Sequence, residues 1–101
     1  MEIIALTPDV VLASATPSVL AVQQATRTVP IVFVLVPDAV GIGIIASLAR
    51  PGGNATGFTM YEFSIGTKWL ELLKQVAPKV TRVAVFRDPA NPAGMGQFGA
   101  I

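Results

Sequence analysis

The sequence has neither cysteine nor histidine among its 101 residues, and these absences exclude much chemistry. Without a thiol or an imidazole, the chain offers no thiol nucleophile, no imidazole general base and no zinc site of the usual kinds. We therefore expect no catalytic residue, no metal ion and no cofactor. The lack of cysteine is compatible with the cytoplasm and with the periplasm alike.

Charged residues are also scarce, at 13% of the chain against about 25% in typical soluble domains. Hydrophobic residues make up 52%, and the mean hydropathy of +0.66 is high for one small domain. This is the composition of a core without a full outer layer, so we expect a piece of a larger protein. The seven basic residues are scattered and the net charge is only +1, which argues against a nucleic-acid partner.

The most apolar stretch, Val29 to Ala49, is long enough to suggest a membrane-spanning helix. However, Pro37 and Asp38 stand at its middle, and a charge at the centre of a spanning helix costs about 2.5 to 3.5 kcal/mol on insertion scales. A strand, a loop and a helix explain the same residues without that cost. The first residues lack a basic segment and a cleavage site, so we expect no signal peptide in this chain.

A short β-branched run leads into a polar loop three times. These runs are Asp9 to Ala13, Pro30 to Val36 and Arg82 to Phe86. A parallel α/β sheet binds its ligand at the carboxyl ends of its strands, where such loops gather. The pattern therefore places any binding function in the loops that follow these three runs.

The remaining segments complete an alternation of strands and helices. Val10 to Leu12 is continuously apolar, which predicts a strand buried on both faces. Thr16 is expected to cap the next helix, with Pro17 in its first turn. The alternation predicts an α/β fold with a parallel sheet and flanking helices. We expect helices over Pro17 to Ala25, Val40 to Leu48 and Ser64 to Val76, a short strand over Thr56 to Thr59, and a helix beginning near Ala93.

The helix expected from Ser64 has the clearest pattern. Its apolar residues recur at helical spacing and form one stripe, so we expect them to be buried. Trp69 lies on this stripe and is interpreted as a core residue. Ser64 can cap the helix, and Pro78 ends it. The stripe consists of Ile65, Trp69, Leu72, Leu73 and Val76.

An enzymatic interpretation remains open at Gly41 to Ala46. This segment matches the dinucleotide fingerprint G-x-G-x-x-G/A, and Glu62 follows about twenty residues later, where an acid could hold a ribose hydroxyl. The fingerprint needs its first glycine directly after the strand, whereas Pro37 to Val40 intervene here. We therefore keep a nucleotide-binding enzyme using Gly41 and Gly43 as an alternative.

Several polar or aromatic residues at the strand ends could bind a ligand. Asp38 and Asp88 each follow an expected strand. Each could bind a ligand, form a local Asx turn, or do both. Ser14 and Thr16 can cap a helix or donate to a ligand beside a helix N-terminus, which favours an anionic group. Tyr61 could stack on a ligand or fill a junction between two lobes.

Two long segments give a specific resemblance. The phrases SLARPGGNATGFT and RVAVFRDPANP, with the residues around them, resemble the ABC-transporter substrate-binding proteins of the tryptophan/tyrosine-type family. The resemblance spans nearly the whole chain and implies a type I periplasmic-binding-protein fold. Members of that family are two-lobed receptors, larger than this chain, and are not enzymes.

The resemblance also implies an arrangement of lobes. Residues 1–60 are expected to form the later part of a first lobe, and residues 61–101 the hinge and the start of a second. The strand order expected for such lobes leaves the three strands of the first part adjacent. The cleft loops then supply the expected ligand-binding residues, which are Ser14, Ala15, Thr16, Pro37, Asp38, Thr59, Tyr61, Asp88 and Asn91.

The function implied is a periplasmic receptor that delivers a small polar solute, an amino acid or a similar carboxylate, to an ABC permease. A ligand-sensing domain of a transcription regulator shares the two-lobed fold and remains a second alternative. Because part of the first lobe is absent from this sequence, one edge of the sheet is expected to be exposed. We therefore also expect self-association through that edge.

Overall fold

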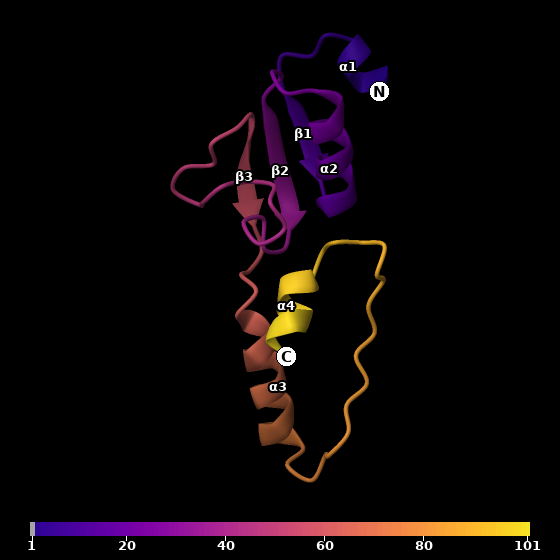
Figure 1. Ribbon diagram of the computed structural model, residues 1–101, viewed down its shortest axis with the longest axis vertical. Coiled ribbons are helices and arrows are strands. Elements are labelled where there is room, and N and C mark those ends of the chain that lie inside the picture. Colours follow the sequence, from indigo (N-terminus) through magenta and orange to yellow (C-terminus); the bar gives the residue numbers. More distant parts are fainter. Residues whose placement is uncertain (1) are drawn as a thin grey trace.

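The structure is a computed structural model that describes residues 2–101. Helices and strands alternate over residues 2–36, a third strand follows at Ala55–Thr59 without an intervening helix, and two helices come after it (Figure 1). The short first helix was not anticipated from the sequence. The elements are α1 (Glu2–Ala5), β1 (Val11–Ser14), α2 (Thr16–Ala25), β2 (Ile31–Val36), β3 (Ala55–Thr59), α3 (Ile65–Val76) and α4 (Met95–Ala100).

The three strands form one parallel sheet in the order β1-β2-β3, which confirms the predicted α/β class and the predicted adjacency of the strands. Val11 pairs with Ile31, and Ile31 pairs with Ala55, so the three strands begin in register. The helix α2 packs on β1 and β2 and contributes Val19 and Val22 to the hydrophobic core. This arrangement brings the carboxyl ends of all three strands to one edge.

The sheet is covered on one face only, which corrects the prediction that the first strand is buried on both faces. Val11 and Ala13 of β1 are buried, but Leu12 between them is 71% exposed. Phe58 of β3 is 73% exposed. Among residues 2–101, the only helix packed on the sheet is α2, and alternate side chains of a strand point to opposite faces. One apolar face therefore stays open.

The helix predicted over Val40 to Leu48 is absent; the chain forms a series of turns there. The amide of Ile42 donates to the Asp38 carbonyl, but the amides of Ile44 and Ile45 both donate to the Ala39 carbonyl. Gly43 has a φ of 81°, in the left-handed region that ends a helix. The segment is nevertheless well packed, because Ile44 and Ile45 join the core of the sheet.

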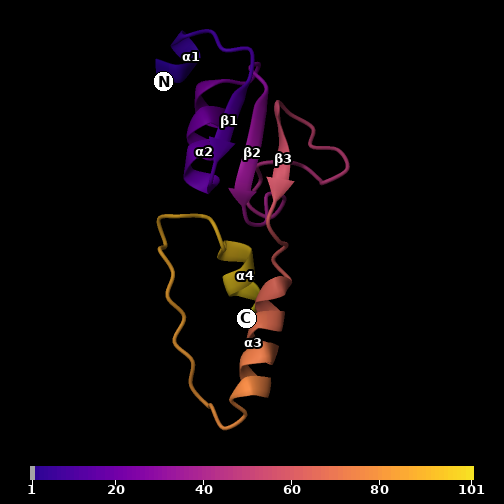
Figure 2. The same cartoon turned by 180° about the vertical axis from the view of Figure 1, so that it is seen from behind.

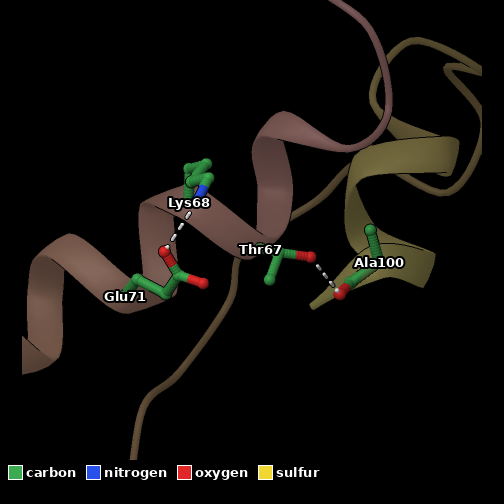
Figure 3. Close-up of polar contacts among 4 residues, drawn as sticks. All are labelled: Thr67, Lys68, Glu71 and Ala100. Atoms are coloured by element: carbon green, nitrogen blue, oxygen red, sulfur yellow. Dashed lines mark hydrogen bonds and ion pairs between the residues drawn. The ribbon is translucent and has the colours of Figure 1, made fainter.

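The helices α3 and α4 pack against each other beyond the carboxyl ends of the strands, as both views show (Figures 1 and 2). The Thr67 hydroxyl of α3 donates to the Ala100 carbonyl of α4 at 3.1 Å, as Figure 3 shows. A Cβ atom on Gly66 would collide with the carbonyl oxygen of Gln97. The close approach of the two helices therefore requires glycine at position 66.

The apolar stripe of α3 is present but not buried, so the prediction of Trp69 as a core residue is wrong for this structure. Trp69 is 43% exposed, and Leu72 and Val76 are exposed as well. Helix α4 has 6 residues and is too short to cover the 12 residues of α3, and it contacts the region around Gly66 and Thr67. The prediction of an amphipathic helix is confirmed, but the described residues supply no surface on which its apolar stripe can pack.

The strand predicted over Arg82 to Phe86 is also absent. This segment is extended but unpaired, and Phe86 is 96% exposed. A β-branched sequence forms a strand only when another strand pairs with it. In residues 2–101 the three strands lie on the far side of α4, as Figure 1 shows, so the segment has no partner.

The two predicted hydroxyl caps do not form. Thr16 is the first residue of α2 and not its cap, a position that Ala15 takes with a φ of 68°. Ser64 does precede α3, but its side chain makes no capping hydrogen bond. The helix α3 ends at Val76, two residues before Pro78, as expected, and Lys74 lies in its last turn. No helix within residues 2–101 has the length and apolar character needed to cross a membrane.

Candidate functional site

Asp38 lies one residue after the end of β2, and hydrogen bonds hold both its main chain and its side chain in place. Its amide donates to the Tyr61 carbonyl at 2.7 Å, and its Oδ1 accepts the amide of Gly41 at 3.1 Å. The expected local turn is therefore present. Asp38 is 4% exposed, and its Oδ2 has no hydrogen-bond partner. A buried carboxylate oxygen without a partner is available for a ligand that donates a hydrogen bond.

The junction of β1 and α2 also carries a buried polar group without a hydrogen-bond partner. Ala15 lies in the left-handed region, where a residue other than glycine is strained. Thr16 is 1% exposed, and its hydroxyl oxygen has no partner. Ser14 is exposed beside it. Two neighbouring strand ends, at Thr16 and at Asp38, thus each carry one buried polar group that the protein leaves unpaired.

Thr59 and Tyr61 connect the end of β3 to the loop after β2. The Thr59 hydroxyl donates to the Val36 carbonyl at 2.9 Å and accepts the amide of Ala39 at 3.3 Å. The ring of Tyr61 meets the ring of Trp69 edge to face, with centroids 5.6 Å apart. Both side chains thus have structural contacts in this conformation.

Asp88 and Asn91 lie on the long segment between α3 and α4. Asp88 Oδ1 accepts the amide of Ala90, and Asn91 Oδ1 accepts the amide of Ala93, so both form local turns. They line a shallow cavity of about 390 Å³ together with Pro17 and other residues of α2. The structure therefore brings the segment from Asp88 to Pro92 against α2.

A second cavity of about 370 Å³ lies beside Asp38. Of the predicted residues it is lined by Asp38 and Thr59, while Asp88 and Asn91 line the other cavity and Pro37 is half-buried between β2 and Asp38. Four of the nine predicted residues thus line one or the other of these two cavities, and the remaining five, Ser14, Ala15, Thr16, Pro37 and Tyr61, line neither. The wall of this cavity consists of Asp38, Ala39, Val40, Gly41, Ser47, Leu48, Thr59, Glu62 and Phe63.

Gln97 of α4 was missed by the sequence reasoning. It is 1% exposed, and neither polar atom of its side chain has a hydrogen-bond partner. Its neighbour Gly96 approaches Asp38 so closely that a Cβ atom there would lie 2.5 Å from Asp38 Oδ2. The available signal was weak: Gln97 is the single polar side chain in the segment from Ala93 to Ala100.

The described part of the chain contains no group of three acidic side chains that could hold a metal ion. The buried side chains with unpaired polar atoms are the carboxylate of Asp38, the hydroxyl of Thr16 and the primary amide of Gln97. Such groups can form hydrogen bonds with a ligand and, in the case of Asp38, attract a cation. The arrangement suits the binding of a small polar molecule.

A parallel α/β sheet with unpaired polar groups at the carboxyl ends of its strands defines a class of ligand-binding proteins. A family model described as ABC transporter substrate binding protein matches residues 1–97. The chain belongs to this family of substrate-binding proteins. The fold and family expected from the sequence are confirmed.

One similar curated protein is the tyrosine-binding protein of Clostridioides difficile, which is 42% identical over 83 residues. The match covers 82% of this chain and 24% of the relative. The chain thus spans about a quarter of that protein's length.

Two solved structures are similar as well. A conserved domain protein from Vibrio cholerae matches with a TM-score of 0.84 and 34% identity, over 97% of this chain and 32% of that one. An ABC domain from Streptococcus pneumoniae in complex with L-Trp matches with a TM-score of 0.70 and 29% identity, over 79% of this chain and 26% of that one. The similarity therefore extends across the α/β part and beyond it.

Proposed function

We propose that this chain is part of a solute receptor that delivers an amino acid or a similar small carboxylate to an ABC importer. The observation that carries the proposal is Asp38, a buried carboxylate with one unpaired oxygen beside a cavity, in a member of the substrate-binding family. The names of two similar proteins, which mention tyrosine and L-Trp, support an amino acid as the solute.

The proposal includes a division of labour along the chain. Residues 2–60 supply the sheet and its strand ends, and residues 61–101 supply the hinge and the beginning of the opposing lobe. Ser14, Ala15, Pro37 and Thr59 form the near wall of the cleft, with Thr16 and Asp38 as its polar contacts. Tyr61 lies at the hinge, and Asp88 and Asn91 face the near wall. Closure of the two parts around the solute would exclude water from these contacts.

The family is one of binding proteins, so the proposed role is not enzymatic. Its partners would be the solute and a membrane permease, and its place would be the periplasm or the outer side of the membrane. The nucleotide-binding alternative loses its structural support, because Gly41 and Gly43 lie in turns and do not open a helix. No observation favours the regulator alternative over the receptor.

Calorimetric titration with the twenty amino acids tests the proposal, using the protein in the longest form that its gene encodes. We expect saturable binding of at least one amino acid, and a loss of about tenfold or more in affinity for Asp38→Asn. Asp9→Asn is the matched control, because Asp9 is exposed and precedes β1. Absence of binding, or equal affinity in the wild type and Asp38→Asn, would contradict the proposed role.

A further inference from the structure

The segment from Thr81 to Arg87 has the sequence of a strand but no strand beside it. Within residues 2–101, none of its amides or carbonyls takes part in a main-chain hydrogen bond, and every one of its residues is exposed. The three strands of the sheet lie apart from it in both views (Figures 1 and 2). Extended main chain with free donors and acceptors is a template on which another strand can pair.

The segment has one apolar face directed at a helix. Val83 and Val85 line a cavity of about 530 Å³ together with Leu70 of α3. Phe86 is not part of that wall and is 96% exposed, as expected if alternate residues lie on opposite faces. Two paired strands are stable in water only with further support, for example from a helix that covers one face. The helix α3 lies where it can give this support.

The charges at the two ends of the segment are complementary. Arg82 lies near its start and Asp88 directly after its end, and neither has an ion-pair partner within residues 2–101. Two such segments can pair antiparallel with Val85 opposite Val85. Arg82 of each copy then lies opposite Asp88 of the other copy. Opposite charges that face each other across two strands stabilise the pair, and like charges destabilise it.

Neighbouring registers lack this match. A shift of one residue in one direction places Arg82 opposite Arg87, and a shift in the other direction places Arg82 opposite Pro89, which has no amide to donate. A parallel pair in register places each charge opposite itself. The antiparallel register centred on Val85 is therefore favoured, and because it is symmetric the contact closes at two chains.

We infer that the 101-residue chain forms a two-fold symmetric dimer, in which the segment from Thr81 to Arg87 pairs antiparallel with the same segment of a second copy. The inference goes beyond the proposed receptor function and does not depend on it. Val83 and Val85 of both copies lie on one face of the two-stranded ribbon. Asp88 keeps its local turn in the dimer, because Oδ1 accepts the Ala90 amide and Oδ2 remains for the partner's Arg82.

The absence of cysteine from the chain makes the register testable by disulfide cross-linking. Val85→Cys places a thiol opposite its own copy, where the Cα atoms lie about 4.5 to 5.5 Å apart, within the reach of a disulfide. Val83→Cys is the matched control, since Val83 and Val85 are 49% and 45% exposed. In this register the two copies of residue 83 lie about 14 Å apart. We expect mild oxidation to cross-link Val85→Cys about tenfold faster or more.

Charge substitutions test the ion pairs. Arg82→Asp and Asp88→Arg each place like charges opposite each other twice per dimer, so each should raise the dissociation constant about tenfold. An equimolar mixture of these two variants should restore the wild-type value, because opposite charges then meet at both ends. Arg50→Asp is the matched control, an exposed arginine outside the segment. Sedimentation equilibrium measures the constants in chains that also carry Leu12→Lys and Phe58→Lys, so that the open face of the sheet does not contribute.

The outcomes separate this dimer from other kinds of association. Equal cross-linking of the two cysteine variants, or none in either, refutes the register. If the charge variants and their mixture have the wild-type constant, association through another surface explains any dimer, and the inference is overturned. A chain that stays monomeric at all concentrations overturns it as well. None of these results bears on the receptor function, which is measured by amino-acid binding.

Discussion

At the scale of single residues, Asn54 joins the loop that precedes β3 to the loop that precedes β2. Its Nδ2 donates to the Val29 carbonyl at 2.8 Å and to the Thr26 carbonyl at 3.4 Å. Its own carbonyl accepts the amide of Ile31. One side chain thus ties the start of β3 to the turn that precedes β2.

Replacing Asn54 by alanine should lower the free energy of unfolding by about 1–3 kcal/mol, because two carbonyl groups lose their donor. Urea denaturation monitored by circular dichroism measures the change. Lys68→Ala is the control: its ion pair with Glu71, drawn in Figure 3, is exposed and should contribute no more than about 0.5 kcal/mol. Equal midpoints for Asn54→Ala and the wild type would show that these hydrogen bonds are replaced by water.

At the scale of elements, the contact between α3 and α4 depends on a missing side chain. Gly66 lies against the main chain of Gln97, where any Cβ atom would collide with a carbonyl oxygen that cannot move independently of its helix. Gly99 lies on the same short helix α4 and has open space around its Cβ position. Substitution of Gly99 is therefore a suitable control for substitution of Gly66.

Gly66→Ala should separate α4 from α3, and Gly99→Ala should not. We expect faster amide hydrogen exchange in Met95 to Ala100 for the first variant. For the second we expect equal or slower exchange, because alanine favours a helix by about 1 kcal/mol over glycine. Exchange followed by mass spectrometry distinguishes them. Unchanged exchange in Gly66→Ala would mean that α4 is held by other contacts.

The correspondence between sequence and structure also differs from element to element. β1, α2, β2, β3 and α3 were predicted within a few residues, because each is specified by a local pattern. The pattern over Arg82 to Phe86 was equally clear but needs a neighbouring strand that residues 2–101 do not contain. In Val40 to Leu48 the apolar residues favoured a helix, but the glycines, with Gly43 in the left-handed region, favour the turns that are observed.

The site was only partly predictable for the same reason. Asp38 could be found from the sequence, because a polar residue directly after a parallel strand lies at the carboxyl edge in any such fold. Gln97 could not be found, because its burial depends on how α4 packs on α3, about thirty residues earlier in the chain. The hydroxyl caps at Thr16 and Ser64 failed because cap formation depends on dihedral angles that composition does not determine.

At the scale of the whole molecule, the chain is elongated and exposes much apolar surface. Its principal extents are 56 × 27 × 17 Å, and α3 and the open face of the sheet both contribute large exposed side chains. β1 and β3 are the edges of the sheet in the described residues. Unpaired strand edges and apolar patches of this kind favour association.

The 101-residue chain on its own should therefore self-associate. Sedimentation velocity at increasing protein concentration should show species larger than a monomer. Leu12→Lys with Phe58→Lys should shift the distribution toward the monomer, because both side chains lie on the open face. Leu12→Val with Phe58→Tyr is the conservative control. A sharp monomeric boundary with a cooperative thermal transition would contradict this expectation.

The contact of Tyr61 with Trp69 has an optical consequence. Trp69 is the only tryptophan of the chain, and its ring meets that of Tyr61, whose carbonyl accepts the amide of Asp38. The indole is therefore connected, through Tyr61 alone, to Asp38, whose carboxylate is proposed to bind the ligand. Its emission spectrum, sensitive to solvent at a half-exposed position, provides an intrinsic fluorescent reporter of events at Asp38 without any added label.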